Sequence, residues 1–369
     1  MSETVIPQEI LNTYFPKKSD LPTERDDERN EMLLAQIRHR VELVCLFTSL
    51  TCPSSPSSDH QYPISPSLSS PSSIYNVKIT SQQNLIKRKP GCGQGDTTLV
   101  LAAQVGANGQ VDAVDPGDPD YGSPWTLSQA QSQLKYGPLG HRITFHNSFP
   151  IPFLQSLLTS LSSSSSTTQD SRPYTHIILS HSTFYFSSPS LFPQLISYIS
   201  SLSLSSPQTS KSTPIVLTKE TQICIAEWDL SAPSPAQFPH LLAVMLQAVS
   251  EGFKKEGEEG SGNVRCVRST TQMRKVMREE GWKVKREMVK EGRGLEDGVW
   301  EVRNVGRWKE GELKRVKDVA GKEDREGKRG NVLEMMYNVL DASLGNVEGG
   351  VKGVEAMGVW VASFGREDW

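Results

Sequence analysis

Apolar residues recur along the chain in short blocks whose spacing alternates between that of a strand and that of a helix. The blocks with strand character lie at 110–114, 142–146, 176–179, 222–227, 282–289, 298–305 and 359–364. The blocks with helical character lie at 24–47, 97–105, 126–134, 152–161, 190–202, 238–253, 270–280 and 331–344. Helices that alternate with buried strands predict an α/β fold, a doubly wound, Rossmann-like and mostly parallel sheet with helices on both faces and late antiparallel strands. The helix at 24–47 either leads into this sheet or is a solvated, charged helix.

Serine and proline dominate three stretches between these blocks, at 51–73, 161–171 and 200–214. Such stretches hold too few apolar side chains to offset the entropy lost on ordering, so we expect disordered surface insertions. The predicted organisation is an N-terminal helical segment at 1–50, a Ser/Pro-rich insertion at 51–73, and an α/β domain at 74–369. A charged helical insertion is expected within that domain, at about 306–345.

Charge and cysteine content narrow the class of protein. A formal net charge of −3 offers no basic excess to neutralise phosphates, which argues against a nucleic-acid partner. The five cysteines are scattered, with no CxxC pair, as is typical of free thiols in a reducing compartment. Neither a signal peptide nor an apolar run long enough to span a membrane is evident. We therefore expect a soluble, cytoplasmic protein without a membrane partner.

A glycine-rich turn is the strongest chemical signal in the chain. Glycines alternate in Gly91-Cys92-Gly93-Gln94-Gly95, where the missing Cβ atoms allow a ligand to approach the backbone closely. A helix follows, and then the strand at 110–114 ends in Asp115. A carboxylate about 20 residues beyond such a loop has the spacing of a ribose-binding acid, which predicts a nucleotide-type cofactor.

The turn and Asp115 carry a resemblance to a known family. The runs 91–96 and 113–116 resemble the first two motifs of class I S-adenosylmethionine-dependent methyltransferases, whose usual loop is GxGxG. Dinucleotide oxidoreductases more often show GxGxxG, and Asp96 stands where that pattern needs a small residue. The runs 121–127, 180–186 and 226–228 are similar to fungal methyltransferases of this class. The resemblance implies S-adenosyl-L-methionine as cofactor and a small-molecule acceptor.

The same resemblance implies which residues bind the cofactor. The loop would pass beneath the methionine and ribose moieties, and the carboxylate of Asp115 would accept hydrogen bonds from the ribose hydroxyls. Asn147 occupies the region from which the family contacts the adenine amine. The implied cofactor-binding residues are Gly91, Cys92, Gly93, Gln94, Gly95, Asp115, Pro116 and Asn147.

Methyl transfer from a sulfonium relies largely on holding two reactants close and aligned, so it does not require a catalytic residue. If the acceptor must lose a proton, His181 is the candidate base, because it follows a buried strand where active-site residues of α/β sheets gather. The alternative is that His181 only orients the loop or the cofactor. Candidates to line the acceptor pocket, or simply to pack, are Tyr185, Glu227 and Trp228. His141 and His146 have no partner at ligand spacing, so we expect no metal site.

The segment before the loop departs from the family pattern. A central strand is expected there, yet Leu85-Ile86-Lys87-Arg88-Lys89-Pro90 combines three cations with a proline. The first strand is therefore either 74–79 or 85–88. One hypothesis is that 45–89 replaces an ordinary segment through a gene-model or splicing error. Two alternative functions stay open, an NAD(P)-dependent oxidoreductase and a catalytically inactive methyltransferase-like protein with a damaged first strand.

Overall fold

The computed structural model describes residues 6–14, 27–48, 76–80, 93–122, 125–163, 173–203, 216–254, 262, 264–319 and 327–366. Gly91 and Cys92 lie outside these ranges, as do 51–73 and the greater part of the other two Ser/Pro-rich stretches. The predictions made for them therefore stay predictions.

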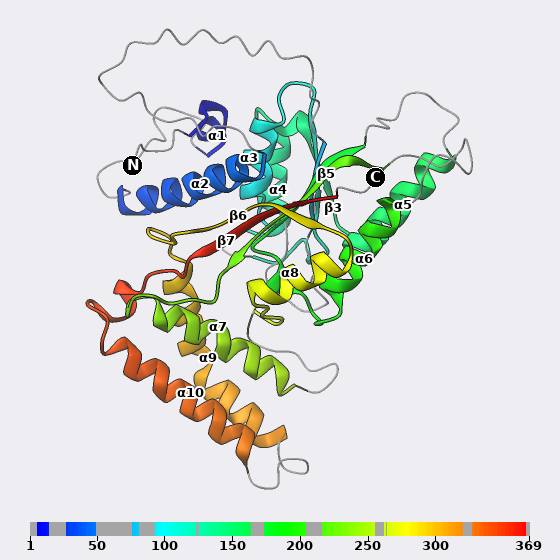
Figure 1. Cartoon of the computed structure of the whole chain (residues 1–369). Helices are drawn as coiled ribbons and strands as arrows, with labels where there is room; N and C mark the ends of the chain where they lie inside the picture. Colours follow the sequence, from blue (N-terminus) through cyan, green and yellow to red (C-terminus); the bar gives the residue numbers. More distant parts are fainter. Residues whose placement is uncertain are drawn as a thin grey trace.

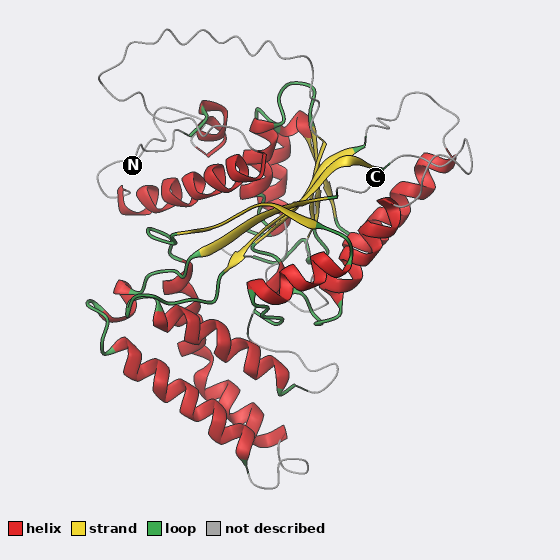
Figure 2. Ribbon diagram, in the orientation of Figure 1, coloured by secondary structure: helices red, strands yellow, loops and turns green. Residues whose placement is uncertain are grey.

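The described residues form a seven-stranded sheet at the centre of the molecule (Figure 2). The strands are β1 Asn76–Thr80, β2 Gln110–Val114, β3 Ile143–His146, β4 Tyr174–Ser180, β5 Leu217–Trp228, β6 Lys283–Lys290 and β7 Val359–Gly365. Their order is β3-β2-β1-β4-β5-β7-β6, and β1 to β5 run parallel. β7 pairs antiparallel with both β5 and β6. The predicted doubly wound sheet with a late antiparallel strand is confirmed.

The first strand is the earlier of the two candidates. β1 begins at Asn76 and pairs with β2 on one side and β4 on the other, so it occupies the centre of the sheet. Cys45 and Phe47 of the preceding helix are buried in the core. Parts of 45–89 are thus built into the fold, whereas 81–92 lies outside the described residues and the proposed sequence error stays a hypothesis.

Helices cover both faces of the sheet (Figure 1). They are α1 Gln8–Tyr14, α2 Asp27–Thr48, α3 Asp96–Gln104, α4 Leu127–Tyr136, α5 Pro150–Ser163, α6 Leu191–Ser203, α7 Phe238–Gly252, α8 Thr270–Glu279, α9 Asp297–Val319 and α10 Lys328–Leu344. Strand residues alternate between two cores: Ile178 and Cys224 pack with α2 and α3, whereas Ile177 and Ile223 pack with α5, α6 and α8. This is the period of two that a pleated strand imposes.

The N-terminal helix α2 packs beside the sheet, which decides between the two interpretations of 24–47. Its side chains Ile37, Val41 and Val44 are buried in the core that also holds Val359 and Val361 of β7. Burying such side chains contributes roughly 1.5–3 kcal/mol each, enough to hold a helix whose sequence is otherwise strongly polar.

Two sequence predictions were wrong. The first residues of two expected disordered insertions, 161–163 and 200–203, belong to helices α5 and α6. The expected strand at 298–305 belongs to helix α9. Val299, Val302 and Val305 are spaced three apart, so they lie on one helical face, and they are buried against α7 and α10. Valine favours strands, but the packing of this face overrides that preference. The helical segment expected at about 306–345 consequently starts near Asp297. That it is an insertion into the domain stays a prediction.

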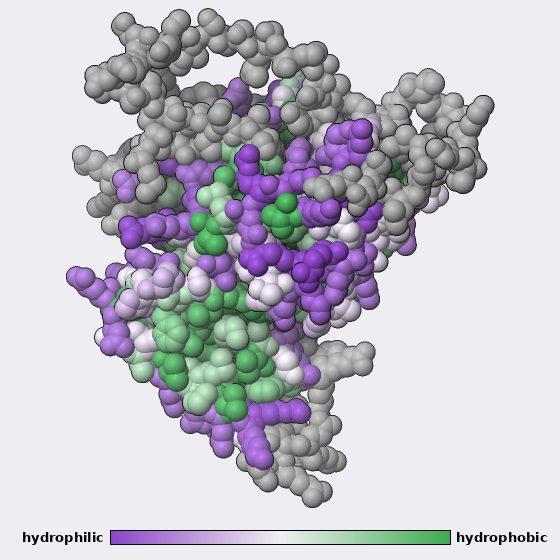
Figure 3. Space-filling view, in the orientation of Figure 1, coloured by the Kyte–Doolittle hydropathy of each residue, from purple (hydrophilic) through white to green (hydrophobic). Residues whose placement is uncertain are grey.

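The three helices α7, α9 and α10 form a layer beside one end of the sheet (Figure 1). Apolar side chains also gather on the outer surface of this layer (Figure 3). The exposed large apolar side chains on α10 and α7 are Val332, Met335, Val339, Phe238 and Met245.

Candidate functional site

Polar and aromatic side chains follow four parallel strands at the same edge of the sheet. Asp115 follows β2, Asn147 follows β3, His181 follows β4, and Trp228 ends β5. Because parallel strands present their carboxyl ends at one edge, the sheet brings together residues that lie far apart in the sequence. Ligands of open α/β sheets bind at this edge.

The carboxylate of Asp115 ties the glycine loop to the end of β2. Its Oδ2 accepts a hydrogen bond from the Gly93 N–H at 2.9 Å, and its Oδ1 accepts one from the Gly117 N–H at 2.8 Å. Asp115 is 3% exposed. Pro116 follows it, half-buried. Each carboxylate oxygen has a second lone pair, so the same group can also accept from ribose hydroxyls.

The loop needs glycine for conformation and for space. Gly93 and Gly95 adopt φ values of 53° and 96°, which other residues rarely adopt. A Cβ atom on Gly95 would lie 2.3 Å from Leu134 Cδ1. The side chain of Gln94 donates to the Trp125 carbonyl at 2.9 Å and so braces the loop.

A cavity of about 220 Å³ opens beside Gly117, two residues after Asp115, between the ends of β2 and β3 and helix α4. Asn147 lines it and donates from Nδ2 to the Gly117 carbonyl at 2.6 Å, which leaves its amide oxygen as an acceptor for an adenine amine. The cavity is lined by Gly117, Pro119, Leu127, Ser128, Gln131, Ser132, Lys135, Phe145 and Asn147. Apolar Phe145 and Leu127 together with polar Asn147 suit an adenine ring, so the residues present fit the cofactor.

His181 is held in an unusual backbone conformation. Its φ is 46°, in the left-handed region that costs an ordinary residue roughly 1 kcal/mol or more. Its N–H donates to the Ala226 carbonyl at 2.8 Å, and its ring lies 4.7 Å from that of Trp228. Its Nδ1 lies 3.7 Å from Glu227 Oε1. Non-glycine residues in this region are found preferentially at functional sites.

Glu227 is 1% exposed and holds the turn beyond β4 in place. Its Oε2 accepts from the Thr183 N–H at 3.0 Å, from Thr183 Oγ1 at 2.8 Å and from the Phe184 N–H at 3.3 Å. This turn, Thr183–Tyr185, also carries the partly buried Tyr185. Burial raises the pKa of Tyr185 well above 10, and the charges of Glu301, Glu227 and Asp297 raise it further. The structure thus brings His181, Tyr185, Glu227 and Trp228 together.

Two histidines that the sequence did not single out complete this cluster. His39 of α2 places its Nε2 3.4 Å from His181 Nε2. His240 of α7 lies with its ring 4.8 Å from that of Trp228 and accepts from the Met357 N–H at 2.9 Å. Burial lowers the pKa of His240 to about 4. The only sequence signal was a histidine among the buried positions of an amphipathic helix, and that is usually a packing feature.

Within the described ranges, no group of three histidine, cysteine or acidic side chains could hold a metal ion. His146 instead contacts Asp112 Oδ1 at 2.7 Å, and Tyr174 donates to the other oxygen of Asp112 at 2.6 Å. Nor does any helix in the described part of the chain have the length and apolar character to cross a bilayer.

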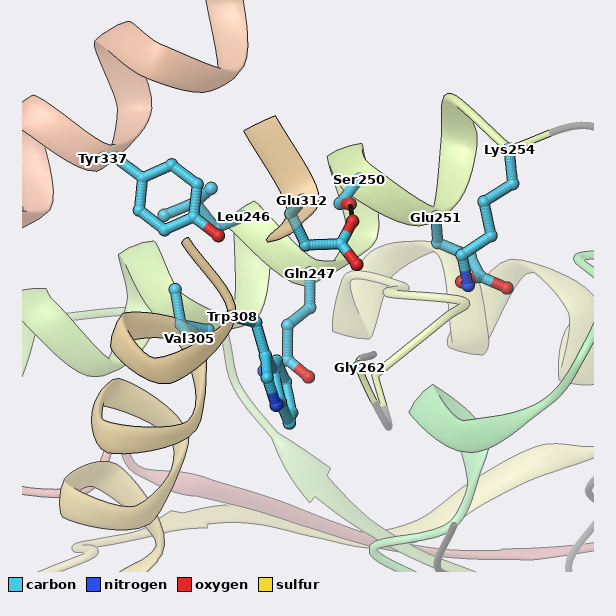
Figure 4. Close-up of a pocket in the computed structure, with 10 residues that line it drawn as sticks. All are labelled: Leu246, Gln247, Ser250, Glu251, Lys254, Gly262, Val305, Trp308, Glu312 and Tyr337. Atoms are coloured by element: carbon cyan, nitrogen blue, oxygen red, sulfur yellow. Dashed lines mark hydrogen bonds and ion pairs between the residues drawn. The ribbon is translucent and has the colours of Figure 1, made fainter. Parts of the chain in front are cut away.

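A second pocket lies inside the helical layer, between α7, α9 and α10 (Figure 4). Ser250 donates to Glu312 there, and Arg315 donates to Glu312 at 2.9 Å. Its volume is about 10 Å³, room for about one water molecule. It therefore cannot be the acceptor site.

Comparison with solved structures agrees with this geometry. The fold is similar to that of a cyclopropane-fatty-acyl-phospholipid synthase-like protein from Lactobacillus casei, with a TM-score of 0.57 and 20% identity over 93% of this chain and 94% of that one. Fold and site together support a class I S-adenosylmethionine-dependent methyltransferase, with S-adenosyl-L-methionine as its cofactor.

The curated relatives of this sequence are named as methyltransferases. The chain is 24% identical over 299 residues to methyltransferase phomM' and 23% identical to methyltransferase phomM, both of Diaporthe leptostromiformis. Each alignment covers 75% of this chain and 72% of the relative. No family model matches the chain. The resemblance to fungal methyltransferases expected from the motifs is thereby confirmed.

Proposed function

We propose that this chain transfers the methyl group of S-adenosyl-L-methionine to a small-molecule acceptor, with the cofactor at the ends of β1 to β3 and the acceptor at the ends of β4 and β5. The observation that carries the proposal is the gathering of Asp115, Asn147, His181 and Trp228 at the carboxyl edge of one sheet. The cofactor supplies an electrophilic methyl group on a sulfonium sulfur. The protein then has to hold an acceptor in line with that methyl group and to take up the proton that the acceptor loses.

The cofactor side of this proposal rests on the loop and on Asp115. Gly91, Cys92 and Gly93 would pass beneath the methionine moiety, and Asp115 would accept from the ribose hydroxyls. Asn147 would accept from the adenine amine. The burial of Asp115 and its two backbone donors support this assignment, because they hold the carboxylate in one orientation before the cofactor arrives.

On the acceptor side, His181 would take the proton that a hydroxyl or acid loses. The buried carboxylate of Glu227 lies 3.7 Å from His181 Nδ1, where it would stabilise an imidazolium. Tyr185 and Trp228 would line the acceptor pocket. If His181 only orients its neighbours, its replacement by asparagine, which tolerates the left-handed conformation, should leave methyl transfer within about threefold of the original rate.

Isothermal titration with S-adenosylhomocysteine and with NADH tests the function directly. Heat is expected with S-adenosylhomocysteine only. Heat with NADH alone would instead favour an oxidoreductase. A folded protein that gives heat with neither ligand would identify an inactive methyltransferase-like protein.

We also propose a division into 1–50, 51–73 and 74–369, a cytoplasmic location and a fungal source. The buried free thiols of Cys224 and Cys266 support a reducing compartment. The two fungal relatives support the source. Localisation of a tagged chain by fluorescence microscopy would test the compartment.

A further inference from the structure

A chain of polar contacts leads from His181 through the N-terminal helix to the edge of the sheet. His181 Nε2 lies 3.4 Å from His39 Nε2, and His39 Nδ1 lies 3.3 Å from Lys290 Nζ. Lys290 in turn contacts Glu42 Oε2 at 2.5 Å. His39 is 2% exposed, so bulk water does not compete for its ring nitrogens. Three elements, α2, β6 and the turn after β4, therefore meet through two imidazole rings.

The contacts determine which nitrogen of each ring carries the proton. A lysine ammonium group has donors and no acceptor, so His39 Nδ1 accepts from Lys290. Burial, followed by the charges of Arg40, His181 and Lys290, lowers the pKa of His39, and a neutral ring carries a single proton. That proton is on His39 Nε2, and it is donated to His181 Nε2. The proton of a neutral His181 must then be on Nδ1, facing Glu227.

The opposite tautomer of His181 does not fit these contacts. With its proton on Nε2, His181 would direct a donor at the Nε2 donor of His39. Relieving that clash by moving the His39 proton to Nδ1 would direct it at the Lys290 ammonium. Either arrangement sets two donors against each other inside the protein and turns the lone pair of His181 Nδ1 toward the carboxylate of Glu227. The Nδ1–H form instead turns a proton toward that carboxylate, at 3.7 Å and beyond hydrogen-bond distance.

We propose that His39 is a positioning residue: it fixes His181 in the Nδ1–H tautomer and occupies the Nε2 lone pair that a general base needs. The functional consequence rests on the proposed methyl transfer. His181 can receive the acceptor's proton on Nε2 only after the acceptor has replaced His39 at that nitrogen. Helix α2 thereby becomes part of the acceptor site, although His39 lies 142 residues before His181. The imidazolium that results keeps its Nδ1–H facing the carboxylate of Glu227.

Nitrogen-15 NMR of the full-length chain, labelled in its histidine rings and recorded near pH 8, tests the tautomer. His181→Asn assigns the signals. The wild-type chain should show His181 protonated on Nδ1. His39→Phe keeps an aromatic ring and removes both ring nitrogens, so the Nδ1–H form should be lost in favour of Nε2–H, the more stable tautomer of a free imidazole side chain.

Lys290→Met provides a second variant in case His39→Phe does not fold, because it keeps the aliphatic stem and removes only the donor. It should lower the Nδ1–H population of His181 by at least half. Lys219→Met on β5, where the side chain is 68% exposed, is the matched control and should leave the population unchanged. A wild-type His181 protonated on Nε2 would overturn the proposal. So would an Nδ1–H form that persists in every folded variant at His39 and Lys290.

The NMR measurement needs no turnover, so it separates this proposal from the proposed function. A chain with the Nδ1–H tautomer that binds no S-adenosylhomocysteine would contradict the methyltransferase function alone. A chain that binds S-adenosylhomocysteine and carries the Nε2–H tautomer would contradict the role of His39 alone.

Discussion

The two halves of the sheet's carboxyl edge satisfy their polar groups in different ways. On the cofactor side, Asp115 and Asn147 hydrogen-bond to backbone groups of the loops around them, and among the described residues one buried atom, Thr98 Oγ1 of α3, has no partner. On the acceptor side, four buried atoms have no hydrogen-bond partner among the described residues: Ser180 Oγ, His181 Nδ1, Ser182 Oγ and His240 Nε2. Buried polar atoms are normally paired.

This difference shows on which side a bound molecule would add the most new hydrogen bonds. The cofactor side is a cradle whose geometry the protein maintains by itself. The acceptor side retains buried donors and acceptors that a polar molecule or an ordered water would satisfy. Substitutions on the two sides should accordingly have different effects. Those on the cofactor side should lower the affinity for the cofactor, and those on the acceptor side should lower the free energy of unfolding.

The largest effect is expected from Glu227→Ala. The substitution leaves the buried N–H groups of Thr183 and Phe184 and the Thr183 hydroxyl without an acceptor, so the free energy of unfolding should fall by about 4 kcal/mol. Urea denaturation measures the change. Glu220→Ala on the same strand, where the side chain is 65% exposed, should cost less than about 0.5 kcal/mol. Similar losses in the two variants would remove Glu227 from its place as the support of this turn.

Acid should destabilise the acceptor side next. The pKa of His240 is about 4 when folded, against 6.5 for the ordinary group, because of burial. The unfolded chain therefore binds this proton first. The contribution of neutral His240 to the free energy of unfolding is fully present above about pH 6.5. It falls by about 3 kcal/mol as the pH drops to about 4. His176, whose pKa burial also lowers to about 4, adds a similar loss from the middle of β4.

His240→Gln keeps an acceptor for the Met357 N–H and removes one titrating group. It should therefore reduce the slope of unfolding free energy against pH by the contribution of one proton. His141→Gln, at an exposed position, is the control and should leave the slope unchanged. Thermal unfolding between pH 4 and pH 8 provides the measurement. A slope that is the same in both variants would contradict a neutral, buried His240.

Asp115→Ala should weaken binding of S-adenosylhomocysteine by roughly thirtyfold, about 2 kcal/mol. It removes the charged acceptor of the ribose and releases the Gly93 N–H. Calorimetric titration measures the affinity. Asp120→Ala, at an exposed position in the same loop, should bind as the original chain does. Unchanged affinity in Asp115→Ala would exclude this carboxylate from the cofactor site.

The smallest effect is expected from Asn147→Ala, which removes a neutral acceptor at the rim of the 220 Å³ cavity. Affinity for S-adenosylhomocysteine should fall about fivefold, about 1 kcal/mol, with the unfolding midpoint nearly unchanged. A loss larger than that of Asp115→Ala would reverse the expected order of the two contacts.

Local signals predicted much of this molecule. The strand at 110–114 and its terminal Asp115 were predictable, because a buried apolar run followed by an acid has few other interpretations. Thr126 and Ser269 each begin a helix with a capping box, a signal contained within four residues. His181 could be placed for the same reason, since it directly follows a buried strand.

Features that depend on distant packing were not predictable. In α9, the segment 298–305 has the composition of a strand. It forms a helix because its apolar face packs against α7 and α10. His39 acquires its role from His181 and Lys290, neither of which lies near it in sequence. The sequence alone could not show whether the first strand lies at 74–79 or at 85–88, because its position depends on pairing with β2 and β4.

The order of the last strands has a consequence for synthesis on the ribosome. β6 lies at the edge of the sheet and touches it only through β7, yet β7 is made after the two long helices α9 and α10. At about 5–20 residues per second, β6 must wait several seconds for its partner. An unpaired strand is prone to pair with another chain, and charged side chains suppress such pairing. The charged and exposed sequence of β6, KVKREMVK, thus protects the nascent chain during the interval before β7 closes the sheet.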